Sequence, residues 1–190
     1  MIQHPPTSQS RLPVRALSWV SPDRVATTLA RHLDDSWHYV RHAAPGGMKR
    51  IDAVVVGPGG TWTVTLAEEH GRFRKRNGHW YRWNASTDSW IPWDAVAVTS
   101  ARLAGHRLEL LLERAALPAV VEACLVTQRA MEVSWEADQK PGVHVYNDPD
   151  KLGKRILRDE VLTAAQVDRI VALLDPRQPL PRLAPSAPQG

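Results

Sequence analysis

Hydrophobic positions along the chain follow two spacings, which predict helices in some segments and strands in others. Apolar residues from Val25 to Leu33 recur every three or four positions, as on one face of a helix. Ser21 suits the N-cap of that helix and Pro22 its first position. The pattern predicts a helix from Ser21 that ends near residues 34–35.

The next part of the chain predicts a block of strands. Alternating or β-branched runs cover residues 37–42, 51–56, 62–66, 72–76 and 79–83. Gly57-Pro58-Gly59-Gly60 predicts a tight turn between two of these strands, and Asn77-Gly78 predicts a two-residue hairpin. The segment from Ser86 to Pro92 is expected to be a loop.

The C-terminal half returns to helices with strands between them. Helical spacing covers residues 98–114, and extended runs cover 120–126, 131–135 and 143–146. Asp148 begins a helix through Leu157, and Thr163 caps a last helix over residues 164–174. This order predicts one α/β (or α+β) domain at residues 15–175, with a mixed central β-sheet flanked by helices.

Composition sets the boundaries of that domain. Residues 1–14 and the Pro-rich residues 176–190 are polar, which predicts a disordered segment at each end. No apolar run reaches the roughly 20 residues that cross a bilayer, and no signal peptide is evident. Cys124 is the single cysteine, so an internal disulfide or a cysteine-rich zinc site is excluded. We therefore expect a cytoplasmic protein without a membrane partner.

The net charge of +4 permits an anionic partner without requiring one. Arginine far outnumbers lysine, which a GC-rich genome explains at least as well as phosphate recognition does. Charge alone therefore does not decide the partner.

One predicted hairpin combines basic and aromatic residues. The turn at Asn77-Gly78 places six of them on one face, in the pairs Arg76–His79, Arg74–Tyr81 and Arg72–Trp83. The other face then carries the pairs Lys75–Trp80 and Phe73–Arg82. Arginines beside aromatic rings suit phosphate contact and base stacking, and they equally stabilise a solvated hairpin. The candidate nucleic-acid-binding residues are Arg72, Arg74, Arg76, Tyr81 and Trp83.

The first hairpin carries a family resemblance. Residues 51–60 read Ile-Asp-Ala-Val-Val-Val-Gly-Pro-Gly-Gly, a strand beginning Ile-Asp followed by a Gly-Pro-x-Gly turn. This resembles the NERD (nuclease-related domain) family of the PD-(D/E)xK nuclease superfamily, and the order of predicted elements resembles that family from Ser21 to Leu157. The resemblance implies a PD-(D/E)xK nuclease-like fold and a bacterial protein connected with DNA.

The same resemblance implies a degenerate site. Such nucleases hold Mg²⁺ with an aspartate on one strand and an acid on the next, with a lysine two residues further. Asp52 matches the first ligand, and the ungapped spacing from Gly60 to Gly71 puts Thr65 at the second acid and Ala67 at the lysine. The scaffold is thus expected to lack most of its catalytic groups, as in a pseudoenzyme.

Three functions remain open at this point. The first is a non-catalytic binding module for DNA, with no cofactor and with Asp52 satisfied by backbone donors. The second is a nuclease that holds Mg²⁺ with Asp52 and Glu69, which requires the return strand to continue to residue 69. The third is a protein-interaction domain without a nucleic-acid role.

The remaining candidate residues give weaker indications of a functional role. Cys124 lies in an apolar run and is expected to be an inert core thiol. Trp90 and Trp93 are expected to be packing residues in a loop, and an exposed pair would indicate a partner site. His38 and His42 lie on an extended segment, so their spacing does not make a helical metal pair.

Overall fold

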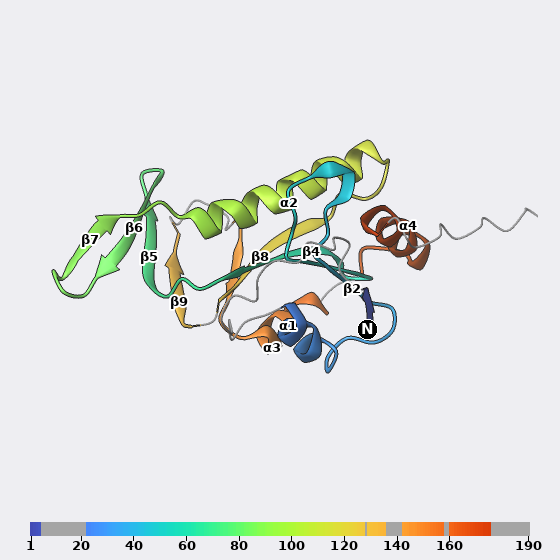
Figure 1. Cartoon of the computed structure of the whole chain (residues 1–190), viewed down its shortest axis with the longest axis horizontal. Helices are drawn as coiled ribbons and strands as arrows, with labels where there is room; N and C mark the ends of the chain where they lie inside the picture. The colour runs from blue at the N-terminus through green and yellow to red at the C-terminus, as the bar shows by residue number, and fades with distance from the viewer. Residues whose placement is uncertain (5–21, 128, 136–141, 158–159, 176–190) are drawn as a thin grey trace, which may run out of the picture.

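The computed structural model describes residues 1–4, 22–127, 129–135, 142–157 and 160–175. Its strands form two sheets, one of six strands and one of four, at opposite ends of a long helix (Figure 1). No helix within these ranges is long and apolar enough to cross a membrane.

The six-stranded sheet is mixed. Its order is β1-β2-β3-β4-β8-β10, in which β2, β3 and β4 are antiparallel and the other neighbours are parallel. The strands are β1 (Ile2–His4), β2 (His38–Arg41), β3 (Ala53–Gly57), β4 (Gly60–Ala67), β8 (Val121–Thr127) and β10 (His144–Tyr146).

Helices cover both faces of this sheet. On one face lie α1 (Pro22–Leu29) and α3 (Pro149–Ile156), whose apolar residues share a core with Val55, Val64 and Cys124. On the other face lie α2 (Val96–Arg114) and α4 (Ala164–Leu174), packed on Val54 and Val56. Alternate residues of β3 therefore serve two cores, which explains its unbroken β-branched run.

The four-stranded sheet has the order β7-β6-β5-β9. Its strands are β5 (Gly71–Arg76), β6 (His79–Asn84), β7 (Ser89–Pro92) and β9 (Met131–Ser134). Phe73 and Met131 on its inner face share a core with Val98 and Ala101 of α2. The 19 residues of α2 span about 28 Å at 1.5 Å per residue, enough for one helix to serve both sheets.

The predicted mixed sheet flanked by helices is confirmed for the six-stranded sheet, while the second sheet was not expected. The chain leaves β4 through the irregular residues 68–70, and Gly71 has a φ of 105°. That left-handed conformation, which favours glycine, turns the chain away from the first sheet.

The structure corrects three expectations at the level of elements. Residues 2–4, expected to be disordered, form β1, because their backbone pairs with β2 and His4 is buried. The first helix ends at Leu29 rather than near residue 35, because the bonds Arg31 N–H to Thr28 O and His32 N–H to Leu29 O tighten the next turn. Ser21, residues 5–14 and residues 176–190 lie outside the described residues.

The third correction concerns the segment predicted as a loop between Ser86 and Pro92. Residues 89–92 form β7, which pairs with β6 from Ser89–Asn84 to Pro92–Tyr81. Pro92 is tolerated there because β7 is the edge strand of its sheet, where a missing N–H breaks no ladder bond.

Candidate functional site

One face of the second sheet presents arginine and aromatic side chains away from α2. The hairpin register is Arg76–His79, Arg74–Tyr81, Lys75–Trp80 and Phe73–Arg82, as predicted. Because side chains alternate along a strand, the pairs sort onto two faces. The outer face comprises Arg72, Arg74, Arg76, His79, Tyr81, Trp83, Trp90 and Pro92.

Cation–π contacts organise the outer face. The Arg74 guanidinium lies 4.3 Å from the ring centroid of Trp90 and 5.6 Å from that of Tyr81. Arg72 lies 5.6 Å from the centroid of Trp83 and 3.8 Å from the Glu132 carboxylate. Such contacts hold the guanidinium groups over the rings, where their N–H groups can still bind an anion.

Among the described residues, Arg76 is the arginine of this face whose side chain has no hydrogen bond, ion pair or ring contact. It is exposed near the hairpin turn. Arg74, by contrast, is half-buried, and its buried Nε has no hydrogen-bond partner in the described part of the chain.

Trp90 and Trp93 lie on opposite sides of the four-stranded sheet. Trp90 stacks on Arg74 and meets Trp83 edge-on, at 5.3 Å between centroids and 65° between planes. Trp93 packs on the inner side, 4.2 Å from the centroid of Phe73. Trp90 is therefore a member of the outer face that the sequence prediction missed, because the prediction placed it in a loop.

Asp52 stands just before β3, and its carboxylate joins the two strands of the first hairpin. Its Oδ2 accepts the backbone N–H of Leu66 at 2.8 Å. Its own carbonyl accepts the N–H of His42 at 2.9 Å. The expected backbone donor to this acid is thus present.

The structure separates the residues of the predicted metal site. Thr65 lines the same hollow as Asp52, and Ala67 is buried against the core of the second sheet. Strand β4 ends at Ala67, so the strand extension that would carry Glu69 toward Asp52 does not form. Glu69 instead lines a different hollow, with His70, Phe73 and Arg82.

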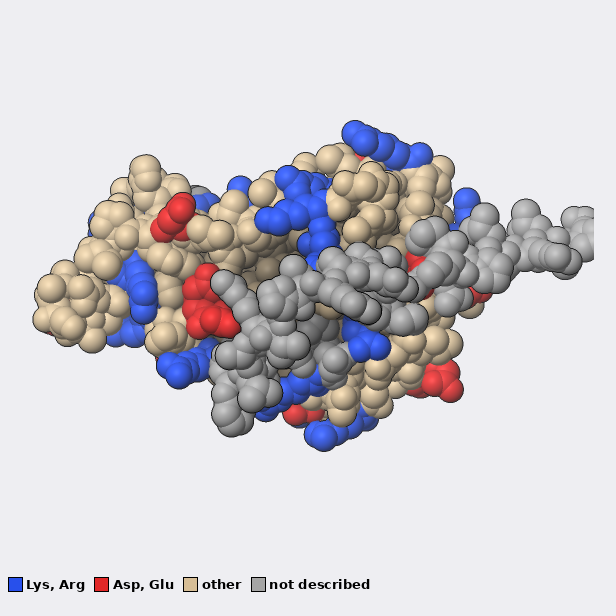
Figure 2. Space-filling model, in the orientation of Figure 1, with Lys and Arg blue, Asp and Glu red and all other residues tan. Residues whose placement is uncertain are grey.

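The hollow at Asp52 is basic. It has a volume of about 270 Å³ and lies between α2 and the segment that leads into β3. It is lined by Met48, Lys49, Arg50, Ile51, Asp52, Thr65, Ser100, Leu103, Ala104 and Arg107. Figure 2 shows Lys and Arg side chains gathered beside the middle of α2.

These residues do not fit the Mg²⁺ ion that the family resemblance implies. Asp52 is the one carboxylate of the hollow, and one of its oxygens already accepts Leu66 N–H. Thr65 is neutral, and three cationic side chains would repel a divalent cation. Within the described ranges, no group of three His, Cys, Asp or Glu residues could hold a metal.

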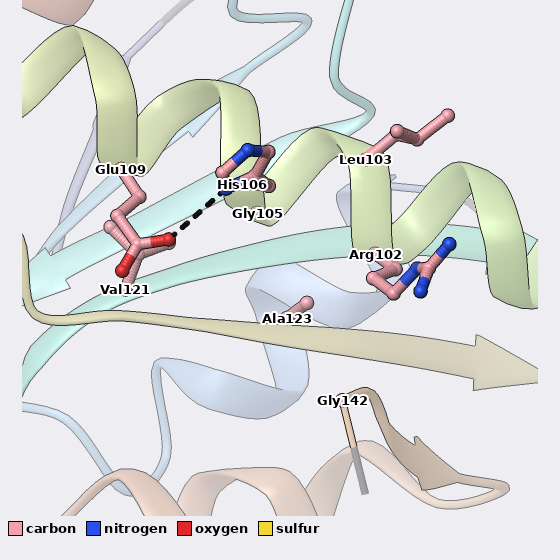
Figure 3. Close-up of a pocket in the computed structure, with 8 residues that line it drawn as sticks. All are labelled: Arg102, Leu103, Gly105, His106, Glu109, Val121, Ala123 and Gly142. Carbon is pink, nitrogen blue, oxygen red and sulfur yellow. Dashed lines mark hydrogen bonds and ion pairs between the residues drawn. The ribbon is translucent and has the colours of Figure 1, made fainter.

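A larger hollow of about 480 Å³ lies where α2 crosses β8 (Figure 3). Gly105 of α2 lies against Ala123 of β8 in its lining, and Arg102 and His106 come from the same helix. His106 Nδ1 lies 3.4 Å from Glu109 Oε2, and both side chains are exposed. Because this pair is solvated and lies within one helix, it contributes little to stability.

Burial shifts the pKa values of Cys124 and His38. Burial raises the pKa of Cys124, whose side chain is fully enclosed, as expected for an inert core thiol. Burial also lowers the pKa of His38, and the neighbouring His4 lowers it further. His4 Nε2 lies 3.0 Å from His38 Nδ1, and His4 Nδ1 lies 3.7 Å from the buried carboxylate of Asp175.

The chain was compared with known proteins at the levels of sequence and structure. No protein-family model matches it. Neither the curated proteins nor the solved structures contain a match to it.

Proposed function

We propose that the protein is a non-catalytic nucleic-acid-binding module on a nuclease-related scaffold, and that its outer face binds single-stranded DNA. The observation that carries this proposal is the alternation of arginines with aromatic rings on the sheet face opposite the one that packs against α2. Aromatic rings stack on unpaired bases, and guanidinium groups bind the phosphates between them.

The scaffold part of the proposal rests on the β3–β4 hairpin with its Gly-Pro turn and on the order of the surrounding elements. The non-catalytic part rests on the separation of Asp52 from Glu69 and on Thr65 and Ala67 at the remaining positions. In this proposal Asp52 has a structural role, because it stabilises the hairpin by accepting a hydrogen bond from Leu66 N–H.

Fluorescence anisotropy with labelled single-stranded and duplex oligonucleotides tests this function. At about 20 mM salt we expect the protein to bind the single strand more tightly than the duplex. Arg76→Ala should weaken single-strand binding and should lower the slope of log affinity against log salt concentration by about 0.7. Arg82→Ala removes the same charge from the opposite face of the hairpin and should leave affinity within twofold.

Two results would overturn the proposal. Absence of binding at low salt would remove the nucleic-acid role and leave the protein-interaction domain. Cleavage of either oligonucleotide in Mg²⁺ or Mn²⁺, lost in Asp52→Ala, would instead establish the nuclease.

A further inference from the structure

The hollow at Asp52 combines features that the proposed function does not use. It is separate from the outer face, since none of its lining residues belongs to the second sheet. Lys49 and Arg50 reach it from the segment before β3, and Arg107 reaches it from α2. The fold thus brings cations from two distant parts of the chain to one place.

The three cations lack counterions within the protein. In the described ranges, neither Lys49, Arg50 nor Arg107 has an ion pair or a hydrogen bond from its side chain. Asp52 is the sole acid in the lining, so the hollow carries an excess of two positive charges, three cations less one carboxylate.

We infer that this hollow is a binding site for a phosphate group. Two guanidinium groups present planar pairs of N–H donors that match phosphate oxygens, and Lys49 adds a point charge. Ser100 and Thr65 contribute hydroxyl groups to the same lining. The protein's own cations thus occupy the place where the resemblance implies a metal.

The hollow is large enough for a phosphate group. Its volume of about 270 Å³ lies just below the roughly 300–1,000 Å³ of pockets for drug-sized ligands. A phosphate group fits this space, either as a free ion or phosphomonoester or as one phosphodiester of a longer strand. Both sources share the chemistry that the cations recognise.

Titration calorimetry with inorganic phosphate, at ionic strength matched with chloride, tests the site without any nucleic acid. We expect saturable binding that weakens at least fivefold in Arg107→Ala. Arg114→Ala removes the same charge from the last turn of α2, outside the hollow, and should change affinity less than twofold. Equal losses in the two variants, or heats no larger than those of chloride, would overturn the inference.

Asp52→Asn gives a second test with the opposite sign. The amide keeps an acceptor for Leu66 N–H and removes the one negative charge beside the bound phosphate. Phosphate affinity should therefore rise severalfold in Asp52→Asn. Unchanged or weaker binding in a variant that remains folded by circular dichroism would contradict a phosphate next to Asp52.

Measuring single-strand binding by Arg107→Ala in the anisotropy assay identifies the molecule that supplies the phosphate. Weaker single-strand binding, together with weaker phosphate binding, identifies a phosphodiester of the DNA. Unchanged single-strand binding, with phosphate binding lost, identifies a free phosphate or a phosphomonoester. Because a loss of phosphate binding specific to Arg107→Ala reports on the hollow and not on the outer face, the phosphate site and the DNA-binding function can fail independently.

Discussion

At the scale of single residues, Asp52 shows how one side chain supports the fold and shapes a site. Its Oδ2 accepts Leu66 N–H across the β3–β4 hairpin, and its carboxylate also lies in the basic hollow. A carboxylate that accepts a backbone donor holds its position, because the partly buried N–H would otherwise lack a partner.

The structural role of Asp52 predicts a difference between two substitutions. Asp52→Ala leaves Leu66 N–H without its acceptor and should lower the unfolding free energy by about 1–2 kcal/mol. Asp52→Asn retains an acceptor and should cost less than half as much. Urea denaturation measures both, and equal losses would show that the bond contributes little.

The histidine pair predicts a pH dependence. The folded protein holds the pKa of His38 below its ordinary value of 6.5, chiefly through burial and then through His4, while Asp168 acts in the opposite direction. As pH falls through about 6.5, the unfolded chain binds the proton first, so the unfolding free energy decreases toward acid pH.

His38→Asn should reduce this dependence, because an amide can accept from or donate to His4 Nε2 but does not titrate. We expect the fall in Tm between pH 7.5 and 5.5 to be smaller in this variant than in the parent. Thermal melts at several pH values would contradict the argument if the two falls were equal.

At the scale of elements, Gly57 at the end of β3 makes room for the indole ring that precedes β2. The indole of Trp37, just before β2, packs on the Gly57 backbone, and a Cβ at Gly57 would overlap that ring. The glycine of the Gly-Pro turn thus also admits a large aromatic residue into the core beneath α1.

Gly57→Ala should therefore destabilise the protein by about 1–3 kcal/mol through overpacking. Trp37→Leu frees space at the same contact, so the double variant should lose less than the sum of the single losses. Denaturation of all four proteins gives the coupling free energy. If the losses in unfolding free energy were additive, the Trp37 ring would not be overpacked by the alanine side chain.

Sequence reasoning succeeded where local chemistry fixes an element. The Asn77-Gly78 turn set the hairpin register, and Thr163 forms the predicted cap, with Gln166 completing a capping box. It failed for β1, which depends on pairing with the distant β2. It also failed for β7, which was assigned to a loop although Ser89-Trp90-Ile91-Pro92 alternates between the two faces of its sheet and its partner β6 is the preceding strand.

Of the two candidate sites, the outer face could be predicted from local sequence and the basic hollow could not. The six hairpin residues of the outer face were predictable because a period of two and one turn type determine their placement. The basic hollow was not, because nothing local links Arg107 to Lys49 and Arg50. Only packing of α2 against the first sheet brings these residues together.

At the scale of the whole molecule, α2 connects the two basic surfaces. Val98 packs on the second sheet and Arg107 lines the hollow, roughly 14 Å apart along the helix axis at 1.5 Å per residue. A single strand bound on the outer face can reach the hollow only if it extends beyond the sheet.

This arrangement predicts that oligonucleotide length matters. A strand of about 8 nucleotides should bind the outer face with the same affinity in the parent and in Arg107→Ala. A strand of about 20 nucleotides should bind more tightly, and it should lose that advantage in Arg107→Ala. Anisotropy with both lengths measures this, and an advantage that survives the substitution would show that the hollow takes a separate ligand.

The parallel pairing of β4 with β8 bears on how the chain reaches this structure. These neighbours are joined by residues 68–120, which include α2 and three strands of the second sheet. The β5–β6–β7 meander needs only local contacts, and hairpins form in about 1–10 μs, whereas non-local parallel pairing is intrinsically slow. The second sheet should therefore gain structure early in folding, and docking of β8 beside β4 should set the rate of the final step.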